Sequence, residues 1–301
     1  MTKAQHHGLL LLDKKPGVSS FDSLFSVKRA FATGKAGHTG TLDKFASGLL
    51  AVLVGKGVKL ASLFRESVKE YTGIIRFGSE TDTLDPEGAV IARSPVPSRK
   101  EIEAALGGFR GCIMQAPPEF SALHVGGRRA YELAREGKSF EMAKRQITVH
   151  ALELTSYAPP DASVFARVSS GTYIRSLARD IALAAGSRAH LFSLRRTAVG
   201  EFRLEDAVED KGDTETLISA LRPLDRAFFD AFSIPSLYID DEKAESFIRG
   251  RSIAGILDNP ESCLQGSQHA GVFRKSAPCS LLGVIEKKSG TWGYMHVFAD
   301  S

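Results

Sequence analysis

Apolar positions along this chain follow two patterns that predict β-strands. Two segments are short apolar runs bounded by glycine or charged residues, as in interior strands. Other segments alternate apolar and polar positions, as in strands with one buried face. The strands predicted in this way cover residues 8–13, 47–55, 71–77, 147–154 and 164–169.

Apolar residues at helical spacing predict helices at residues 21–32, 99–106 and 173–185. The last of these is the clearest, because its apolar positions recur every three or four residues. Thr172 is its predicted N-cap and Gly186 its predicted stop.

The first helix is predicted to begin after Ser19 or Ser20 as N-cap. Strands and helices do not alternate regularly along the chain. This order of mixed strands and helices favours an α+β fold over a doubly wound one.

A change in composition predicts a domain boundary near residue 233. An acidic stretch gives way over residues 209–235 to prolines and phenylalanines, and short strand-like segments follow. We therefore predict one domain over residues 1–233 and a small, mostly β domain over residues 234–301.

Composition narrows the class of protein. The chain has 301 residues, 43% hydrophobic and 25% charged, which is typical of a soluble globular protein with room for two domains. Its apolar runs are too short for a secretory signal or a membrane span, so a cytoplasmic protein without membrane contact is predicted. Cys112, Cys263 and Cys279 have no zinc or disulfide spacing and are predicted to be mostly buried thiols.

Basic residues concentrate in two stretches. The formal net charge is +4, yet residues 123–145 carry six Lys and Arg against three Glu, and residues 188–203 carry four Arg against one Glu. Aromatic residues are interleaved in both. Clustered cations with aromatics suit phosphate contact and base stacking, although a solvated basic face is the simpler alternative.

Asp43 is the leading candidate for chemistry. It ends the glycine- and threonine-rich segment of residues 37–43, which reads as a tight loop and leads into the predicted interior strand. A carboxylate on a loop anchored to a buried strand is well placed for catalysis. The alternative is that Asp43 only caps a turn or a helix.

Arg175 and Tyr71 are the next candidates. Arg175 lies in the first turn of a predicted helix, where a cation beside free N–H groups makes a site for a carboxylate or a phosphate. Tyr71 begins a predicted strand at a sheet rim. A surface arginine and a core tyrosine are the corresponding alternatives. The sequence has no P-loop, GxGxxG, HExxH or GxSxG motif, so bare side chains are expected to carry any catalysis.

Several segments together resemble the TruB family of tRNA pseudouridine synthases. The segment Ala-Gly-His-Thr-Gly-Thr-Leu-Asp at residues 36–43 resembles the signature loop of that family. The chain departs from the family pattern at two places. It has Lys44-Phe45 where the family usually has Pro-Leu. The family also usually has proline directly after the N-terminal Asp-Lys, whereas here Lys15 intervenes and the proline is Pro16. The other matching segments are residues 12–14, 69–71, 78–83, 117–132, 170–175 and 194–197.

The resemblance implies a fold, domains and partners. The fold would be α+β and pseudouridine synthase-like, with a mostly antiparallel sheet flanked by helices, an RNA-gripping thumb at about residues 115–145, and a PUA-like RNA-binding domain at residues 234–301. The activity would be isomerisation of uridine 55 in the T-arm stem-loop of tRNA, with no cofactor and no metal. The enzyme would be a monomer that needs no protein partner, and it would also assist tRNA folding.

The resemblance also implies roles for residues. Asp43 would be the catalytic carboxylate, acting at C1′, at C6 or on the ribose 2′ proton. Arg175 would hold Asp43 in its charged form, and Tyr71 would stack on the extruded base and relay a proton. The residues implied in substrate binding are His38, which would fill the space left by the flipped base, Lys14 and Leu194 in the pocket, and Arg128 and Arg129 in the thumb.

Two other functions compete with this hypothesis. One is an RNA-binding or RNA-folding protein that kept the scaffold without catalysis. It is disfavoured because Asp43, Tyr71 and Arg175 are all present. The other is a pseudouridine synthase that a guide complex directs to a different RNA, which would require surfaces for protein partners.

Overall fold

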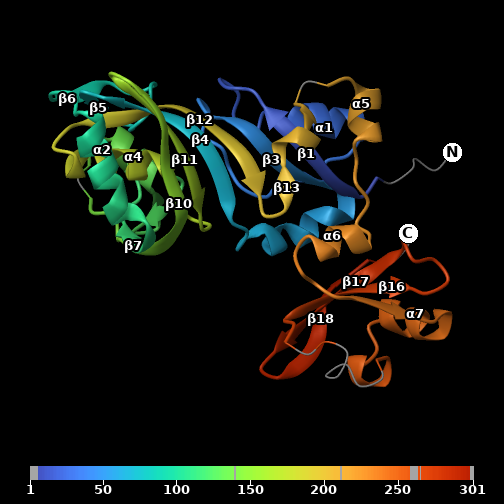
Figure 1. The fold of residues 1–301 in the computed structure, drawn as a ribbon. Helices are drawn as coiled ribbons and strands as arrows, with labels where there is room; N and C mark the ends of the chain where they lie inside the picture. Colours follow the sequence, from blue (N-terminus) through green and yellow to red (C-terminus); the bar gives the residue numbers. More distant parts are fainter. Residues whose placement is uncertain (1–5, 139, 211, 258–263, 265, 299–301) are drawn as a thin grey trace.

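The computed structural model describes residues 6–138, 140–210, 212–257, 264 and 266–298. The molecule is elongated, with one large twisted sheet running through most of its length and a smaller sheet at one end (Figure 1). In the part of the chain that is described, no helix is long and apolar enough to cross a membrane.

The large sheet has ten strands. They are β1 Gly8–Lys14, β2 Ala36–His38, β3 Ser47–Val54, β4 Lys69–Phe77, β7 Gly111–Gln115, β10 Arg145–Ala158, β11 Asp161–Val168, β12 Ala189–Val199, β13 Phe202–Arg203 and β14 Val208–Glu209. Their order is β14-β1-β3-β12-β4-β11-β10-β7, with β2 beside β3 and β13 beside β12. Only β1–β14 and β3–β12 pair in parallel among these neighbours, so the predicted α+β fold with a mostly antiparallel sheet is confirmed.

The apolar runs in β1 and β3 have a direct structural reason. Leu9 and Leu11 enter one hydrophobic core, whereas Leu10 and Leu12 enter another on the opposite face. Alternate residues of β3 divide in the same way. Both faces of these strands are therefore covered, which makes an unbroken apolar run favourable where alternation would bury polar groups.

Helices cover the sheet in separate groups. α2 and α4 pack together over its β4–β11–β10 part, and α1 packs with α5 over β1 and β3. The helices are α1 Leu24–Ala30, α2 Arg99–Leu106, α3 Ala130–Arg135, α4 Ile174–Ala184, α5 Thr214–Ser219, α6 Arg226–Asp230 and α7 Asp241–Ile248, with 3-10 turns η1 Gly55–Phe64, η2 Gly107–Phe109, η3 Leu204–Asp206 and η4 Ile253–Gly255.

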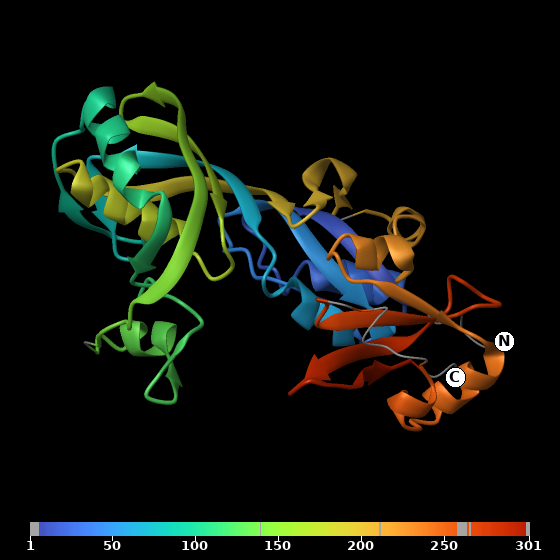
Figure 2. The same cartoon turned by 60° about the horizontal axis from the view of Figure 1, so that its bottom comes forward.

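Two small hairpins extend from the large sheet. β5 (Ser79–Thr81) pairs with β6 (Val90–Arg93) after β4, and β8 (His124–Val125) pairs with β9 (Arg128–Arg129) between β7 and β10. Figure 2 shows that the second hairpin and α3 form a green lobe that projects away from the sheet. We call residues 115–145 the thumb segment.

The C-terminal sheet consists of β15 (Ser236–Ile239), β16 (His269–Arg274), β17 (Leu281–Lys288) and β18 (Thr291–Val297), in that order. It encloses its own core with α7. It also contributes Phe273 and Val284 to a core shared with β1, β3 and α6, where the Phe273 ring lies 5.6 Å from that of Phe229 between centroids.

Local predictions were partly wrong at helix starts. α1 is shorter than residues 21–32, because the Ser20 hydroxyl bonds to the backbone of Leu42 and Ser23 takes the N-cap position without a side-chain bond. Tyr173, rather than Thr172, is the N-cap of α4, and the Thr172 hydroxyl donates to Ser169 instead. The Gly186 stop is confirmed, with a positive φ of 68° just after the C-cap.

The prediction of mostly buried thiols was also wrong. Cys112 and Cys279 are exposed. Cys112 lies on β7, which has a neighbour on only one side, and Cys279 lies between β16 and β17. Cys263 falls outside the described residues.

Candidate active site

The loop between β2 and β3 carries Asp43 and is held on both sides. The Ser20 hydroxyl bonds to both the N–H and the carbonyl of Leu42, at 2.8 and 2.9 Å. The Gly17 N–H donates to the Lys44 carbonyl at 2.8 Å. The residues on either side of Asp43 are thus fixed to the turn that precedes α1, which defines the position of the carboxylate.

Arg175 reaches the same loop from the first turn of α4. It is 5% exposed, and its helix packs an apolar face against the sheet. Arg175 Nε donates to Asp43 Oδ2 at 3.0 Å, and Nη2 donates to Asp43 Oδ1 at 3.1 Å. This two-point geometry fixes the orientation of the carboxylate.

The remaining donors of Arg175 are also used. Nη1 donates to the Thr83 carbonyl at 2.7 Å and lies 3.4 Å from Asp85 Oδ2, while Nη2 also donates to the Phe120 carbonyl at 3.1 Å. Arg175 therefore joins the Asp43 loop, the β5–β6 hairpin and the thumb segment. The Asp85 side chain is 9% exposed, whereas that of Asp43 is 37% exposed, so only the Asp43 carboxylate faces open space.

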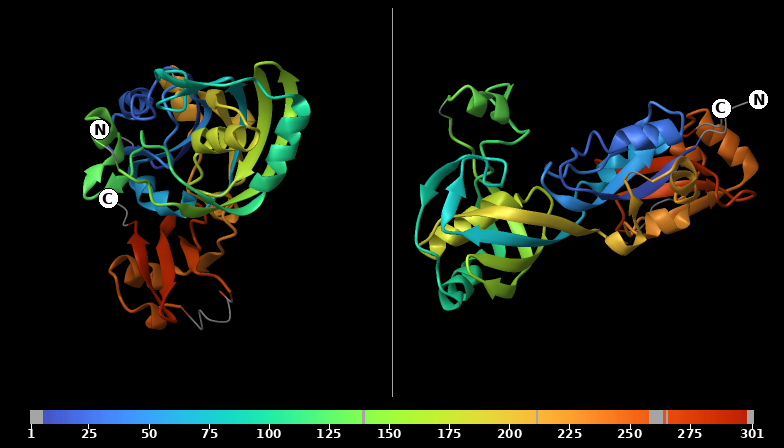
Figure 3. Two further views of the ribbon diagram at one scale, coloured as in Figure 1. Left: turned by 90° about the vertical axis from the view of Figure 1, so that its left-hand side faces the viewer. Right: turned by 90° about the horizontal axis from the view of Figure 1, so that it is seen from above.

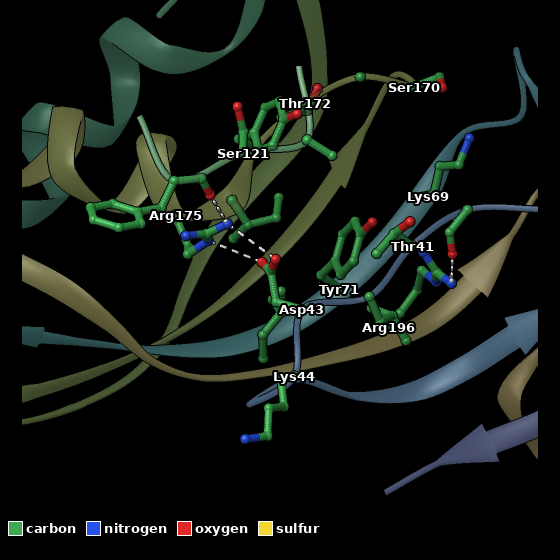
Figure 4. A pocket seen from close by; sticks show the side chains of 18 of the residues that line it. Thr41, Asp43, Lys44, Lys69, Tyr71, Ser121, Ser170, Thr172, Arg175 and Arg196 are labelled. Carbon is green, nitrogen blue, oxygen red and sulfur yellow. Dashed lines mark hydrogen bonds and ion pairs between the residues drawn. The ribbon is translucent and has the colours of Figure 1, made fainter. Parts of the chain in front are cut away.

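A cavity of about 730 Å³ opens over Asp43. Tyr71, Leu194 and Arg175 are among its lining residues. Figure 4 shows the Tyr71 ring beside Asp43, on the side of the carboxylate that faces away from Arg175. Tyr71 is the third residue of β4, not the first as predicted. The structure thus brings the three predicted catalytic candidates together around one cavity.

Two buried cations flank the cavity and were not singled out from the sequence. Arg196 is 2% exposed and donates to the carbonyls of Gly40 at 3.0 Å and Leu49 at 2.7 Å. Burial, and then the nearby Arg196 charge, lower the pKa of Lys69 to about 8. Lys69 donates to the carbonyls of Phe64 and Ser67. Lys69 and Arg196 therefore add two buried basic groups to a cavity lining that also carries the partly exposed carboxylates of Asp43 and Glu87.

Asp85 was also missed from the sequence. The sequence signal was a turn rich in Thr, Asp, Pro and Gly at residues 81–88, which predicts a loop but no role for any one carboxylate. Its contact with Arg175 joins residues 90 positions apart. Such a pairing follows only from the tertiary structure.

Lys14 and His38 are not among the residues that line the cavity. The buried Lys14 ammonium donates to the carbonyls of Val18 at 2.7 Å, Lys15 at 3.1 Å and Lys44 at 3.5 Å. Burial lowers the pKa of Lys14 to about 8, against the opposing effects of Asp210 and Asp43. Burial and Arg196 likewise lower the pKa of His38, which keeps this imidazole neutral at pH 7.

The thumb segment places Arg128 and Arg129 outside the cavity and two other side chains in its lining. Arg128 is paired with Glu136, and Arg129 donates to the Ala122 carbonyl, so both lie on the thumb outside the cavity lining. Tyr131 and Arg135 line the cavity. Among the described residues, no group of three or more His, Cys, Asp or Glu side chains is placed to hold a metal ion.

Solved structures share this fold. The chain aligns with a subunit of a "Cbf5-Nop10-Gar1 Complex" at a TM-score of 0.65 and 23% identity, covering 98% of this chain and 84% of that one. A structure described as "H/ACA RNP bound to a substrate RNA containing 2'-deoxyuridine" aligns at 0.64 and 23%, covering 95% and 82%. At this level of sequence identity, the two structures show that the chain shares their fold.

Sequence comparisons define the class of protein and then the family. Residues 28–174 match the model described as "TruB family pseudouridylate synthase (N terminal domain)", so the chain is a pseudouridine synthase. The protein named tRNA pseudouridine synthase B from Borreliella burgdorferi (strain ZS7) is 42% identical over 240 residues, which cover 79% of this chain and 83% of that protein. The one from Cupriavidus pinatubonensis is 39% identical over 297 residues, covering 96% and 93%. This chain belongs to the TruB family, which confirms the resemblance noted from its motifs.

Proposed function

We propose that this protein isomerises uridine 55 in the T arm of tRNA to pseudouridine, with Asp43 as the catalytic carboxylate. The observation that carries the proposal is the pairing of a partly exposed Asp43 with the buried Arg175, beside Tyr71, on a cavity of about 730 Å³. The tRNA substrate is supported by relatives named tRNA pseudouridine synthase B at 39–42% identity.

The reaction suits these residues. The C1′–N1 bond breaks, the uracil rotates, and a C1′–C5 bond forms, while C5 loses a proton and N1 gains one. Reactants and products have the same atoms and oxidation state. The chemistry requires a carboxylate at the sugar or base, and the two hydrogen bonds from Arg175 hold the Asp43 carboxylate in place on the cavity.

Tyr71 and the cavity account for access to the base. A uridine inside folded RNA is stacked, so an enzyme must extrude it at a cost of a few kcal/mol. The buried Tyr71 ring offers a flat apolar surface to the extruded base, and its hydroxyl is the proposed proton relay at C5. His38 would fill the vacated space only after a movement, since it does not line the cavity here.

The proposal includes a division of labour between domains. Residues 1–233 would be the catalytic domain and residues 234–301 a PUA-like RNA-binding domain, which would act in a monomer without a protein partner. The support is that the cavity is lined by residues from Thr39 to Arg196, whereas the C-terminal sheet has a core of its own. Assistance in tRNA folding would follow from RNA binding and need not involve Asp43.

The test is a map of pseudouridine in tRNA from cells with and without this protein. Loss of pseudouridine at position 55 alone, restored by the wild-type chain but not by Asp43→Asn, is the expected result. Purified Asp43→Asn should bind tRNA within a few-fold of wild type and release less than about a hundredth of the tritium from C5-labelled uridine. Unchanged pseudouridine at position 55, or substantial activity of Asp43→Asn, would contradict the proposal.

A further inference from the structure

The turn before α1 and its first turns present an exposed face of two aromatic and two basic residues. Phe21 and Phe25 are 58% and 59% exposed, and their rings meet edge-on at 5.7 Å between centroids. The Lys28 ammonium lies 5.1 Å from the centre of the Phe21 ring. Within the described part of the chain, neither Lys28 nor Arg29 forms an ion pair with a carboxylate. We call these four residues the α1 face.

A hollow of about 560 Å³ adjoins this face, and Phe25 and Arg29 are among its lining residues. Asp210 also lines it and is 2% exposed. Asp210 Oδ2 accepts from the Ser23 hydroxyl at 3.2 Å and the Lys15 N–H at 3.4 Å, but Oδ1 has no donor among the described residues. A buried acceptor without a donor costs about 1–3 kcal/mol, which a bound N–H group would recover.

The chemistry of the hollow selects a nucleobase. Phe25 supplies an aromatic surface for a planar ring, and Asp210 supplies an acceptor for an N–H group at the edge of that ring. Asp22 and Asp210 together disfavour a phosphate inside the hollow. Lys28 and the exposed Arg29 instead suit the phosphates that flank such a base.

The α1 face lies close to the reacting centre. Ser20, which precedes Phe21, bonds to Leu42, the residue before Asp43. The seven residues of α1 span only about 10 Å. Figure 3 shows α1 in blue and the thumb segment in green on the same side of the molecule in both views. An RNA held between the thumb segment and the cavity would therefore pass the α1 face.

We propose that an unpaired base of the RNA substrate, within a few nucleotides of the reacting uridine, binds in this hollow. The base stacks on Phe25 and donates an N–H from its amino edge to Asp210, while Lys28 and Arg29 contact the neighbouring phosphates. This inference rests on the proposed function only in taking a tRNA loop as the ligand.

The test is an abasic scan of a T-arm stem-loop RNA. Each unpaired loop nucleotide is made abasic in turn, and the dissociation constant is measured with wild type, Phe25→Ala and the control Ile91→Ala, whose side chain is 62% exposed on β6. One abasic position should weaken wild-type binding roughly 5- to 150-fold, the equivalent of about 1–3 kcal/mol of stacking. Phe25→Ala should weaken binding of intact RNA similarly and be insensitive to that same position, whereas Ile91→Ala should behave as wild type.

Two results would overturn the base site. In the first, Phe25→Ala has the same dissociation constant as wild type for every RNA. In the second, Phe25→Ala binds every abasic RNA more weakly than wild type by one common factor, which would indicate a structural effect of the substitution. Pseudouridine formation is measured in parallel on the intact RNA. If wild type forms pseudouridine but Phe25→Ala stays sensitive to every abasic position, the base site is wrong and the proposed function stands. If Phe25→Ala is insensitive to one abasic position but wild type forms no pseudouridine, the base site stands and the proposed function is wrong.

Discussion

Arg175 and Asp85 form an ion pair through the one terminal guanidinium nitrogen that does not contact Asp43, with 3.4 Å between Nη1 and Oδ2. Asp85 Oδ1 in turn accepts from the Thr83 hydroxyl and the Glu87 N–H. The guanidinium is therefore held between two carboxylates, one buried and one facing the cavity. Asp85 is placed to orient Arg175, and through it Asp43.

Asp85→Asn should slow the chemical step with little effect on binding. The amide keeps the size of the side chain but removes the charge that holds Nη1, so Arg175 can turn away from Asp43. A misplaced catalytic group costs about 10- to 100-fold in rate. Single-turnover formation of pseudouridine at saturating enzyme should fall by this factor, while the dissociation constant for tRNA changes less than about threefold. An unchanged rate would show that Thr83 and Phe120 suffice to hold Arg175.

Arg175→Ala should remove activity and leave tRNA binding largely intact. Arg175 is 5% exposed and its polar contacts are with Asp43, Asp85 and two backbone carbonyls, so it is not placed as a phosphate contact. The measurements are the single-turnover rate and the salt dependence of binding. If binding weakened strongly while the saturated rate stayed normal, Arg175 would be an RNA contact and the catalytic set would reduce to Asp43 and Tyr71.

The double variant Arg128→Ala, Arg129→Ala should weaken tRNA binding and leave the chemical step intact. Both residues lie on the thumb, outside the cavity lining. Each lost phosphate contact should reduce the log–log salt slope of binding by about 0.9 for a duplex. The dissociation constant should therefore rise and its salt dependence flatten, at an unchanged saturated rate. Arg99→Ala is the control, because Arg99 is an exposed cation on α2 that pairs with Glu103. A normal salt slope for the double variant would exclude both arginines from the RNA interface.

The sequence predicted five of the ten strands of the large sheet, because those strands carry clear local patterns, and it missed the others, including the central strand β12. The runs in β1 and β3 read as interior strands, and the alternation at residues 71–77 placed β4. Helix starts were less predictable, since they depend on which partner a serine or threonine finds. Ser20 could cap α1, but in the structure its hydroxyl binds Leu42 across the fold.

The candidate site was only partly accessible from local patterns. Asp43 and Arg175 each had a plausible non-catalytic alternative, and their 132-residue separation hides the pairing that unites them. The family resemblance supplied that link. Arg196 and Asp85 were missed because a single arginine or aspartate carries no sign of burial, which arises here from packing between distant strands and loops.

The buried Lys14 gives a pH-dependent stability with a defined sign. Its pKa is about 8 in the folded protein, against 10.5 as the reference value. Between these values the unfolded chain holds more protons at Lys14, so this residue's contribution to the unfolding free energy rises with pH. Wild type should gain about 2 kcal/mol relative to Lys14→Met between pH 7 and pH 9.5.

Urea unfolding of both proteins at the two pH values measures this difference. Lys15→Met is the control, since the hydrogen bond with Glu209 raises the pKa of the exposed Lys15 and keeps it charged. The difference in unfolding free energy between wild type and Lys15→Met should be the same at both pH values. If the difference between wild type and Lys14→Met were also the same at both pH values, Lys14 would titrate as an ordinary lysine.

Arg196→Lys should slow the reaction while preserving the charge at the cavity floor. Arg196 joins two carbonyls, Gly40 in the Asp43 loop and Leu49 in β3, through separate guanidinium nitrogens. A lysine ammonium cannot span both in the same plane. The Asp43 loop would lose one of its fixed points, and the single-turnover rate should fall by about tenfold or more.

The neighbouring Arg195 provides the matched control. Its side chain is 42% exposed and pairs with Asp13 rather than with the Asp43 loop, so Arg195→Lys should react nearly as wild type. The melting temperature of both variants separates a loss of loop positioning from general instability.

A further variant, Arg196→Ala, can be tested for chemical rescue. Added guanidinium should partly restore its rate, because the ion can occupy the emptied space between the two carbonyls. A fully active Arg196→Lys, or a rate loss that only parallels the melting temperature, would contradict a positioning role for Arg196.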